Sequence, residues 1–303
     1  MGRAPAVPTA VIGCGRLARS LIPLLGPAGY PVVTVAGRRL TAARSATRGV
    51  RGARATTSAR IAVVPAQLVL LAVADRAIPE LVDRLAALPN IDWKRRTVLH
   101  HAGALGLEPL RPLSRVGAAV GVLHPLQSLG LPSLAAELLP GSRARVAGDR
   151  RGRAVALSLA RALHLVPLGL RNDLTPEERH AYHAAASLFS NDVVALLAVG
   201  TELLQSIGLG RRRALDSLLP LLRGTLTQID HCGLDGPLTG PAVRGDVDTL
   251  RAHLRRLSRG SPEDGEIHRL LSIRLARLAL ERGERAAAAT VTGLVGRKRK
   301  RRV

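Results

Sequence analysis

Residues 9–18 read Thr-Ala-Val-Ile-Gly-Cys-Gly-Arg-Leu-Ala, and this short stretch constrains the fold more than any other. An apolar run that suits a strand leads into Gly13-x-Gly15-x-x-Ala18 and then into leucines at helical spacing. In such a strand-turn-helix unit Gly13 permits the tight turn, Gly15 lets a pyrophosphate approach the backbone, and Ala18 lets helix and strand pack closely. The stretch favours a dinucleotide-binding unit, although glycine-rich turns also occur as purely structural features.

A second apolar strand is expected at 30–36, and Gly37-Arg38-Arg39 follows it. An NAD site usually has Asp or Glu at this point for the ribose 2′-hydroxyl, whereas an NADP site has arginine facing the 2′-phosphate. The chain has arginine and no acid here, which favours NADP. The alternative is that two arginines carry no meaning in an arginine-rich chain. The predicted cofactor-binding residues are Gly13, Gly15, Arg16, Leu17, Arg38, Arg39 and Ala74.

The order of apolar patterns predicts an α/β protein with a Rossmann-type parallel sheet followed by an all-helical domain. Strand-like runs occur at 68–74, 97–100, 118–123 and 144–147. After about residue 173 only helical periods remain, beginning with Thr175 as N-cap and Pro176 in the first turn. We expect an NADP-binding domain at 1–170, a helical substrate and dimerisation domain at 171–285, and a disordered basic tail at 286–303.

The net charge of +23 raises the alternative of a nucleic-acid-associated protein. The arginines are spread along the whole chain, and only residues 296–302 form a concentrated basic run. With 1% aromatic residues the chain also lacks platforms for base stacking. Nucleic-acid contact is therefore expected to be limited to non-specific contacts of the tail.

Cys14 and Cys232 are too few and too isolated for a disulfide framework, which fits a reducing compartment. The N-terminus does not resemble a signal peptide, and the longest apolar run, 61–74, is too short to span a bilayer. We expect a cytoplasmic protein that does not associate with membranes.

Polar residues recur on one face of the helix expected after Pro176. Spacings of three and four residues align His180, His183, Ser187 and Asn191, and Tyr182 lies about 100° from His183. Such a stripe suits a pocket wall, although a solvent-facing stripe would look the same. A fourth metal ligand is not evident, so no metal site is predicted.

Two further groups lie in expected loops. His124 precedes Pro125 at the exit of a strand, where it would face a cofactor or serve as an ordinary turn residue. Between later helices, Thr239, Arg244 and Asp246 lie among Gly/Pro turns. Arg244 could clamp a substrate carboxylate, and Asp246 could equally cap the next helix.

Several motifs together resemble Rossmann-like proteins that carry a C-terminal domain of unknown function 2520. They are Gly13-x-Gly15-x-x-Ala18, Ala102-Gly103-Ala104, His124-Pro125-Leu-Gln-Ser128, Tyr182-His183-Ala-Ala-x-x-x-x-Ser190-Asn191, and Leu238-Thr239-Gly-Pro-x-x-Arg244-Gly-Asp246 with His253. The resemblance spans about 8–280. It implies kinship with pyrroline-5-carboxylate reductases, 3-hydroxyacid dehydrogenases and ketopantoate reductases, a nicotinamide cofactor, and a homodimer built on the helical domain.

One departure bears on mechanism. Hydroxyacid dehydrogenases and ketopantoate reductases place a catalytic lysine on the first long helix of the second domain, yet no lysine occurs here between Lys94 and Lys298. His183 is therefore the expected proton donor, with His124 in reserve. The other predicted catalytic residues are Tyr182, Ser190 and Asn191, and the predicted substrate-binding residues are Thr239, Arg244 and Asp246.

These assignments predict an NADPH-dependent reductase of a small oxo acid or imine that carries a carboxylate. A ketopantoate-like substrate is the leading candidate by resemblance. The alternatives are a non-catalytic NADP-binding sensor and a nucleic-acid-associated protein that uses the basic tail.

Overall fold

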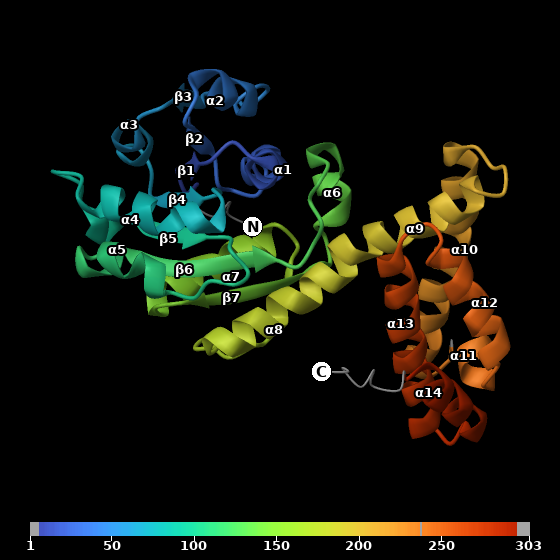
Figure 1. The fold of residues 1–303 in the computed structure, drawn as a ribbon. Helices are drawn as coiled ribbons and strands as arrows, with labels where there is room; N and C mark the ends of the chain where they lie inside the picture. Colours follow the sequence, from blue (N-terminus) through green and yellow to red (C-terminus); the bar gives the residue numbers. More distant parts are fainter. Residues whose placement is uncertain (1–5, 237, 296–303) are drawn as a thin grey trace, which may run out of the picture. The chain divides into compact units, whose positions relative to one another are not determined.

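The computed structural model describes residues 6–236 and 238–295. An eight-stranded sheet with the order β3-β2-β1-β4-β5-β6-β7-β8 forms the centre of the first half of the chain (Figure 1). Strands β1 to β6 are parallel, β7 runs antiparallel to β6, and β8 is parallel to β7. The strands are β1 (Thr9–Ile12), β2 (Val32–Ala36), β3 (Arg54–Thr56), β4 (Leu68–Leu71), β5 (Thr97–His100), β6 (Ala119–Pro125), β7 (Arg143–Gly148) and β8 (Val166–Pro167). The predicted α/β class is confirmed.

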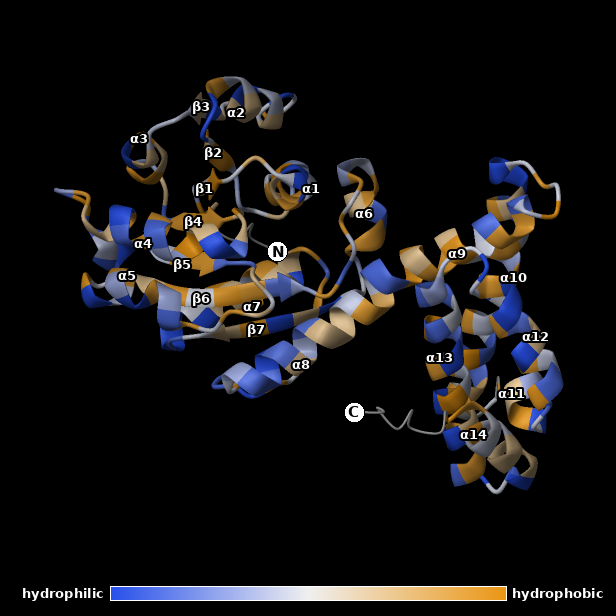
Figure 2. Ribbon diagram, viewed as in Figure 1, coloured by the Kyte–Doolittle hydropathy of each residue, from blue (hydrophilic) through white to orange (hydrophobic). Residues whose placement is uncertain are grey.

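Helices cover both faces of this sheet because successive strand residues point to opposite sides. Val11 and Leu70 belong to one buried cluster with residues of α1 and α7, whereas Ile12 and Leu71 belong to another with residues of α3, α4 and α5. Figure 2 shows the strands near the hydrophobic end of the colour scale. The helices are α1 (Arg16–Leu25), α2 (Leu40–Ala46), α3 (Ala59–Val63), α4 (Ile78–Ala86), α5 (Arg111–Arg115), α6 (Ala135–Leu138) and α7 (Arg150–Ala162).

The turn between β1 and α1 has the local structure expected from its glycines. Gly13 has φ of 123°, and a Cβ atom there would lie 2.1 Å from the carbonyl oxygen of Ala72, so only glycine fits without strain. Gly15 is the N-cap of α1, and a Cβ there would meet nothing within 4 Å. Ala18 is fully buried under the strands. Gly13 is thus required by the fold, whereas Gly15 leaves open space at the helix start.

Backbone contacts divide the chain into two compact units, residues 1–191 and 192–303. The first includes α8 (Pro176–Ser187), which begins with the expected capping box between Thr175 and Glu178. The boundary expected at residue 170 marks the point where strand-like patterns give way to helical ones. The two units divide later along the chain, after Asn191, because Tyr182 and Arg179 of α8 bond to side chains of the sheet unit.

The second unit is helical, as predicted. Its helices are α9 (Val193–Gln205), α10 (Arg211–Cys232), α11 (Pro241–Arg244), α12 (Val247–Leu257), α13 (Pro262–Glu281) and α14 (Ala288–Leu294). The tail expected from residue 286 is incorrect for 286–294, because Ala287, Thr290 and Leu294 are buried against the other helices. The basic run at 296–302 lies outside the described residues.

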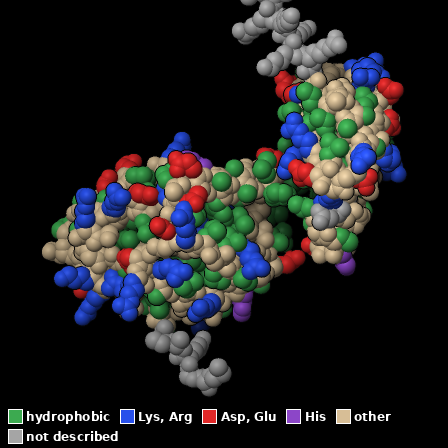
Figure 3. All heavy atoms as spheres, turned by 90° about the horizontal axis from the view of Figure 1, so that it is seen from below, with side chains coloured by type: hydrophobic (Ala, Val, Ile, Leu, Met, Phe, Trp, Pro, Cys, Tyr) green, Lys and Arg blue, Asp and Glu red, His purple; other side chains and the backbone are tan. Residues whose placement is uncertain are grey.

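Within the described residues, one segment is long and apolar enough to cross a membrane by length and composition alone. It is Pro176–Gln205, with a mean hydropathy of 1.5 over its most apolar window and 6% of that window buried. A helix whose apolar face packs against another protein chain has a similar composition, so this segment gives only weak support for a membrane span. Figure 3 shows hydrophobic side chains open on the surface among lysines and arginines.

Candidate functional site

Three adjacent strands end at the same edge of the sheet, where Ile12 of β1 pairs with Ala36 of β2 and with Leu71 of β4. The predicted cofactor residues follow directly: Gly13 to Leu17 after β1, the exposed Arg38 and Arg39 after β2, and Ala74 after β4. No side chain caps the N-terminus of α1, so the first backbone N–H groups of this helix have no side-chain partner and are directed toward this edge of the sheet. The structure therefore brings the predicted cofactor residues together.

A cleft of about 350 Å³ opens beside this turn within the first unit. We call it the histidine cleft; its wall includes Arg16, Leu17, His101, His124, Ser190 and Asn191. The side chains come from the start of α1, the ends of β5 and β6, and the segment after α8. Five of these six residues were predicted as site residues from the sequence, and His101 was not.

His124 is paired with Tyr182 of α8. The Tyr182 hydroxyl lies 2.8 Å from His124 Nδ1, and the two rings meet edge to face at 5.5 Å. Burial raises the pKa of Tyr182 to about 12, so the phenol keeps its proton near pH 7. Burial, aided by the charges of His101 and His183, lowers the pKa of His124 to about 4. His124 is therefore a neutral imidazole near pH 7 that shares a hydrogen bond with the phenol.

The neighbouring histidines at the end of β5 have different roles because they point to opposite sides. His100 Nε2 donates to the Gly106 carbonyl (2.8 Å) and its Nδ1 accepts from the Ala102 amide (3.1 Å), so its bonding is complete. His101 Nδ1 donates to the Leu123 carbonyl (2.5 Å), and its buried Nε2 has no partner. His101 thus presents an unsatisfied acceptor on the wall of the histidine cleft.

Gly103 brings a second ring beside His124. A Cβ atom on Gly103 would lie 2.9 Å from His124 Nε2 and 3.0 Å from His183 Cδ2, so the two rings share the space that glycine leaves. Asp75, just after β4, also lies near His183: burial raises the pKa of its carboxyl, and the charge of His183 opposes that rise. The predicted proton donor therefore lies among ionisable groups.

The helix expected to run straight through Asn191 contains a π-helical turn, η5 (Leu188–Asp192). Within it Ser190 Oγ donates to the Ala186 carbonyl (2.8 Å), and Asn191 Nδ2 donates to Ser187 Oγ (3.3 Å). The extra residue of a π turn shifts the positions that follow around the helix axis, and such turns are frequent at functional sites. Here the turn contains Ser190 and Asn191, the two residues after α8 that line the cleft.

The predicted substrate residues belong to the second unit. Arg244 ends the short helix α11 with an exposed side chain, and Thr239 is exposed just before it. Asp246 caps α12, where its Oδ1 accepts from the Thr249 amide (3.1 Å). Hydrogen bonds with Thr249 lower the pKa of this carboxyl. Capping therefore accounts for Asp246, while Arg244 remains available to a ligand.

The sequence matches two family models. Residues 3–125 match the Rossmann-like domain, and residues 143–275 match the domain of unknown function DUF2520. The chain is a Rossmann-like protein with a DUF2520 domain. No curated protein matches it in sequence.

Solved structures share the fold of this DUF2520 protein. A Bacteroides fragilis protein described as an NADP oxidoreductase has a TM-score of 0.67 at 24% identity, covering 89% of this chain and 98% of the other. An Aspergillus terreus reductive aminase in complex with NADPH has a TM-score of 0.63 at 18% identity (96% and 98% covered). A Coxiella burnetii pyrroline-5-carboxylate reductase has a TM-score of 0.56 at 17% identity (95% and 97% covered). The predicted kinship with this group of reductases is confirmed at the level of fold.

Sequence reasoning did not assign His101, Asp75 or Gly103 a role in this DUF2520 protein. Two signals were available: adjacent histidines in a strand must face opposite sides, and an acid directly after β4 must lie at the cofactor edge. Nothing in the sequence near Gly103 indicates that it lies beside two histidine rings, because α8, which carries one of them, follows more than seventy residues later.

The buried histidines are expected to make the first unit sensitive to acid. Burial lowers the pKa of His100, His101 and His124 to about 4 from 6.5. Above pH 6.5 all three histidines are neutral in the folded and in the unfolded chain, so they do not lower the free energy of unfolding. As the pH falls toward 4 the unfolded chain binds protons that the folded chain does not. Each of these histidines therefore lowers the free energy of unfolding by about 1.4 kcal/mol per pH unit. Urea unfolding between pH 7 and 4 would measure this slope.

The matched control for that experiment is His231→Gln, a substitution at an exposed histidine of α10, which should leave the slope unchanged. Constant stability from pH 6.5 to 5 would contradict the assignment of neutral buried histidines.

Proposed function

We propose that the protein is an NADPH-dependent reductase of a small carboxylate that carries a C=O or C=N group. The observation that carries the proposal is the composition of the histidine cleft: Arg16 and Leu17 of the glycine turn form one part of its wall, and His101 and His124 another. A cofactor seated on the turn and a substrate beside the histidines would meet in one cavity.

The residues present fit a dinucleotide. Gly15 leaves open space at an uncapped helix N-terminus, where N–H groups and the helix dipole favour a pyrophosphate. Exposed Arg38 and Arg39 supply positive charge where a 2′-phosphate would lie, which favours NADPH over NADH. When bound, the nicotinamide would supply the hydride.

Side chains in the cleft and beside it would manage the proton, since His101 and His124 line the cleft and His183 lies next to His124. His183 is the proposed proton donor, because it shares the space beside Gly103 with His124 and lies near the Asp75 carboxyl. His124 is neutral and its Nδ1 is engaged with Tyr182, so its Nε2 would orient the reacting oxygen or nitrogen by hydrogen bonding. His101 Nε2 would accept an N–H or O–H from the ligand.

The substrate class combines a reducible group with a carboxylate. Arg244 is the proposed carboxylate clamp, and a ketopantoate-like oxo acid is one such substrate. The fold shared with a reductive aminase and a pyrroline-5-carboxylate reductase adds imines to the compounds that should be screened. A non-catalytic NADP sensor would need only the cofactor residues, so the set of proton-carrying side chains favours the reductase.

The cofactor proposal predicts a selective thermal shift. NADPH at about 100 times its Kd should add about 2.7 kcal/mol to the stability of the protein, and NADH far less. The Arg38→Ser/Arg39→Ser variant should lose most of the NADPH shift, since two charge-assisted contacts to phosphate are removed. Arg48→Ser, an exposed arginine beyond α2, is the control. Equal shifts with both nucleotides would contradict NADPH selectivity.

The proton-donor proposal predicts a selective loss of turnover. His183→Ala should lower kcat for NADPH oxidation by about 100-fold, the usual contribution of a general acid, and leave the NADPH shift intact. His180→Ala, one turn earlier on α8 and exposed, should retain activity. Full activity of His183→Ala would remove His183 from the mechanism.

We also propose a homodimer built on the second unit. Helices α9 and α10 bury only Thr201 and Ala214, while Val194 is 65% exposed and Leu221 is 69% exposed. So much uncovered apolar surface on two long helices marks an association site, and a second copy of the same helices offers a surface of matching character.

The dimer proposal predicts that light scattering gives twice the chain mass. Leu221→Glu should shift the protein toward the monomer because it would bury a charge in the interface. Val64→Glu, an exposed apolar residue of the first unit that lies outside α9 and α10, should not. A monodisperse wild-type monomer, or recovery only with lipid or detergent, would refute the homodimer.

A further inference from the structure

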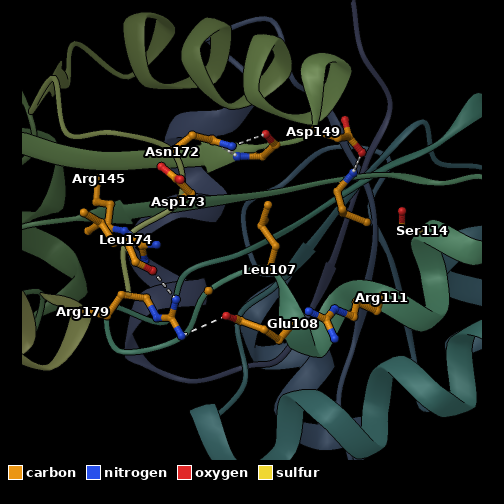
Figure 4. A pocket seen from close by; sticks show the side chains of 13 residues that line it. Leu107, Glu108, Arg111, Ser114, Arg145, Asp149, Asn172, Asp173, Leu174 and Arg179 are labelled. Carbon is orange, nitrogen blue, oxygen red and sulfur yellow. Dashed lines mark hydrogen bonds and ion pairs between the residues drawn. The ribbon is translucent and has the colours of Figure 1, made fainter. Parts of the chain in front are cut away.

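A second cavity of about 400 Å³ lies in the first unit and shares no lining residue with the histidine cleft. It lies between the segment after β5, strands β6 and β7, and the segment that leads into α8 (Figure 4). We call it the arginine pocket; the charged residues of its wall are Glu108, Arg111, Arg145, Asp149, Asp173 and Arg179.

Two of its guanidinium groups are deeply buried, since Arg145 is 2% exposed and Arg179 is 8% exposed. Arg145 donates to the carbonyls of Gly103 (3.5 Å) and Leu105 (2.9 Å). Arg179 donates to the Leu174 carbonyl (2.6 Å) and forms an ion pair with Glu108 (3.1 Å). The Nε atoms of both arginines are buried without a partner. Each side chain therefore has hydrogen-bonding capacity that the described chain leaves unused.

The positive charge is not balanced locally. Glu108 is the one carboxylate in the described chain that contacts either guanidinium, and it pairs with Arg179 alone. Asp149 is engaged elsewhere, as its oxygens accept from the amides of Val120 and Gly152. Burial and the neighbouring Arg179 charge lower the pKa of Arg145, as expected for a cation without a counter-ion. A buried, unpaired cation is costly unless an anion joins it.

The rim supplies further polar groups. Arg111, at the start of α5, is exposed, and Asp173 is an exposed acid of the wall that forms no ion pair with Arg145 or Arg179. Asn172 is held by the backbone of Gly148 and so shapes the wall. Figure 4 shows Arg179 and Glu108 meeting across the lower side of this pocket, with Arg111 beyond them.

We propose that the arginine pocket binds a small organic anion through a carboxylate or phosphate group that accepts from the guanidinium groups of Arg145 and Arg179. Planar guanidinium groups suit both kinds of oxyanion, and the volume fits a small metabolite. The site is separate from the proposed reductase chemistry and does not depend on it.

Calorimetric titration of the full chain with succinate and with inorganic phosphate, at constant ionic strength, tests the site and distinguishes the two oxyanions. Saturable binding of either is expected, and succinamide should not bind. Glu108→Gln should tighten binding about fivefold or more, because it removes a repelling charge and frees Arg179. Arg111→Gln should weaken binding by a similar factor, since it removes an attracting charge.

The matched control is Arg115→Gln, an exposed arginine at the end of α5 that does not line the pocket. Glu108, Arg111 and Arg115 are all exposed, and the Tyr182–His124 hydrogen bond still attaches α8 to the sheet when Glu108 is replaced, so these substitutions should leave the fold intact. Anion binding at the N-terminus of α1 would respond to none of the three. Absence of saturable binding by both anions, or binding that Glu108→Gln and Arg111→Gln leave unchanged, would overturn the proposal.

Discussion

The attachment of α8 to the sheet is the interaction on which the candidate site depends. It rests on the Tyr182–His124 hydrogen bond and the Arg179–Glu108 ion pair, which join residues 58 and 71 positions apart. Without it His124 would lose its partner, and the groups on α8 would no longer lie beside the ends of β5 and β6. The ion pair is half open to solvent on the Glu108 side, whereas the phenol–imidazole bond is largely buried and so contributes more to position.

Arginine does much of the structural bonding in this chain, and that explains how a protein with net charge +23 forms a dense interior. Arg96 directs its N–H groups at the last carbonyls of α3, and Arg145 directs its own at carbonyls of the segment after β5. Such bonds place the cation among dipoles without consuming an acid, which suits a chain with 22 acidic residues against 45 basic ones. An arginine that has only carbonyl partners keeps an unneutralised positive charge, and Arg145 is such a residue.

The sequence predicts those features that depend on short-range pattern. The glycine turn, the Thr175 cap and the Asp246 cap of α12 follow from steric and hydrogen-bonding rules acting within a few residues, and each is found in the structure. Features set by distant packing were missed: the π turn at 188–192, the helix at 288–294, and the proximity of Gly103 to two histidine rings. These depend on what the chain meets far along its length, and no local rule carries that information.

Arg145 links the two cavities physically. Its guanidinium lines the arginine pocket and holds the carbonyls of Gly103 and Leu105, while Gly103 lies against the rings of His124 and His183. The same short segment after β5 thus contacts the guanidinium of the arginine pocket and the His124 ring of the histidine cleft. Because both contacts involve Gly103, which has no side chain, the backbone of this segment is what separates the two groups. Arg145 therefore helps to fix the position of a segment that borders both cavities.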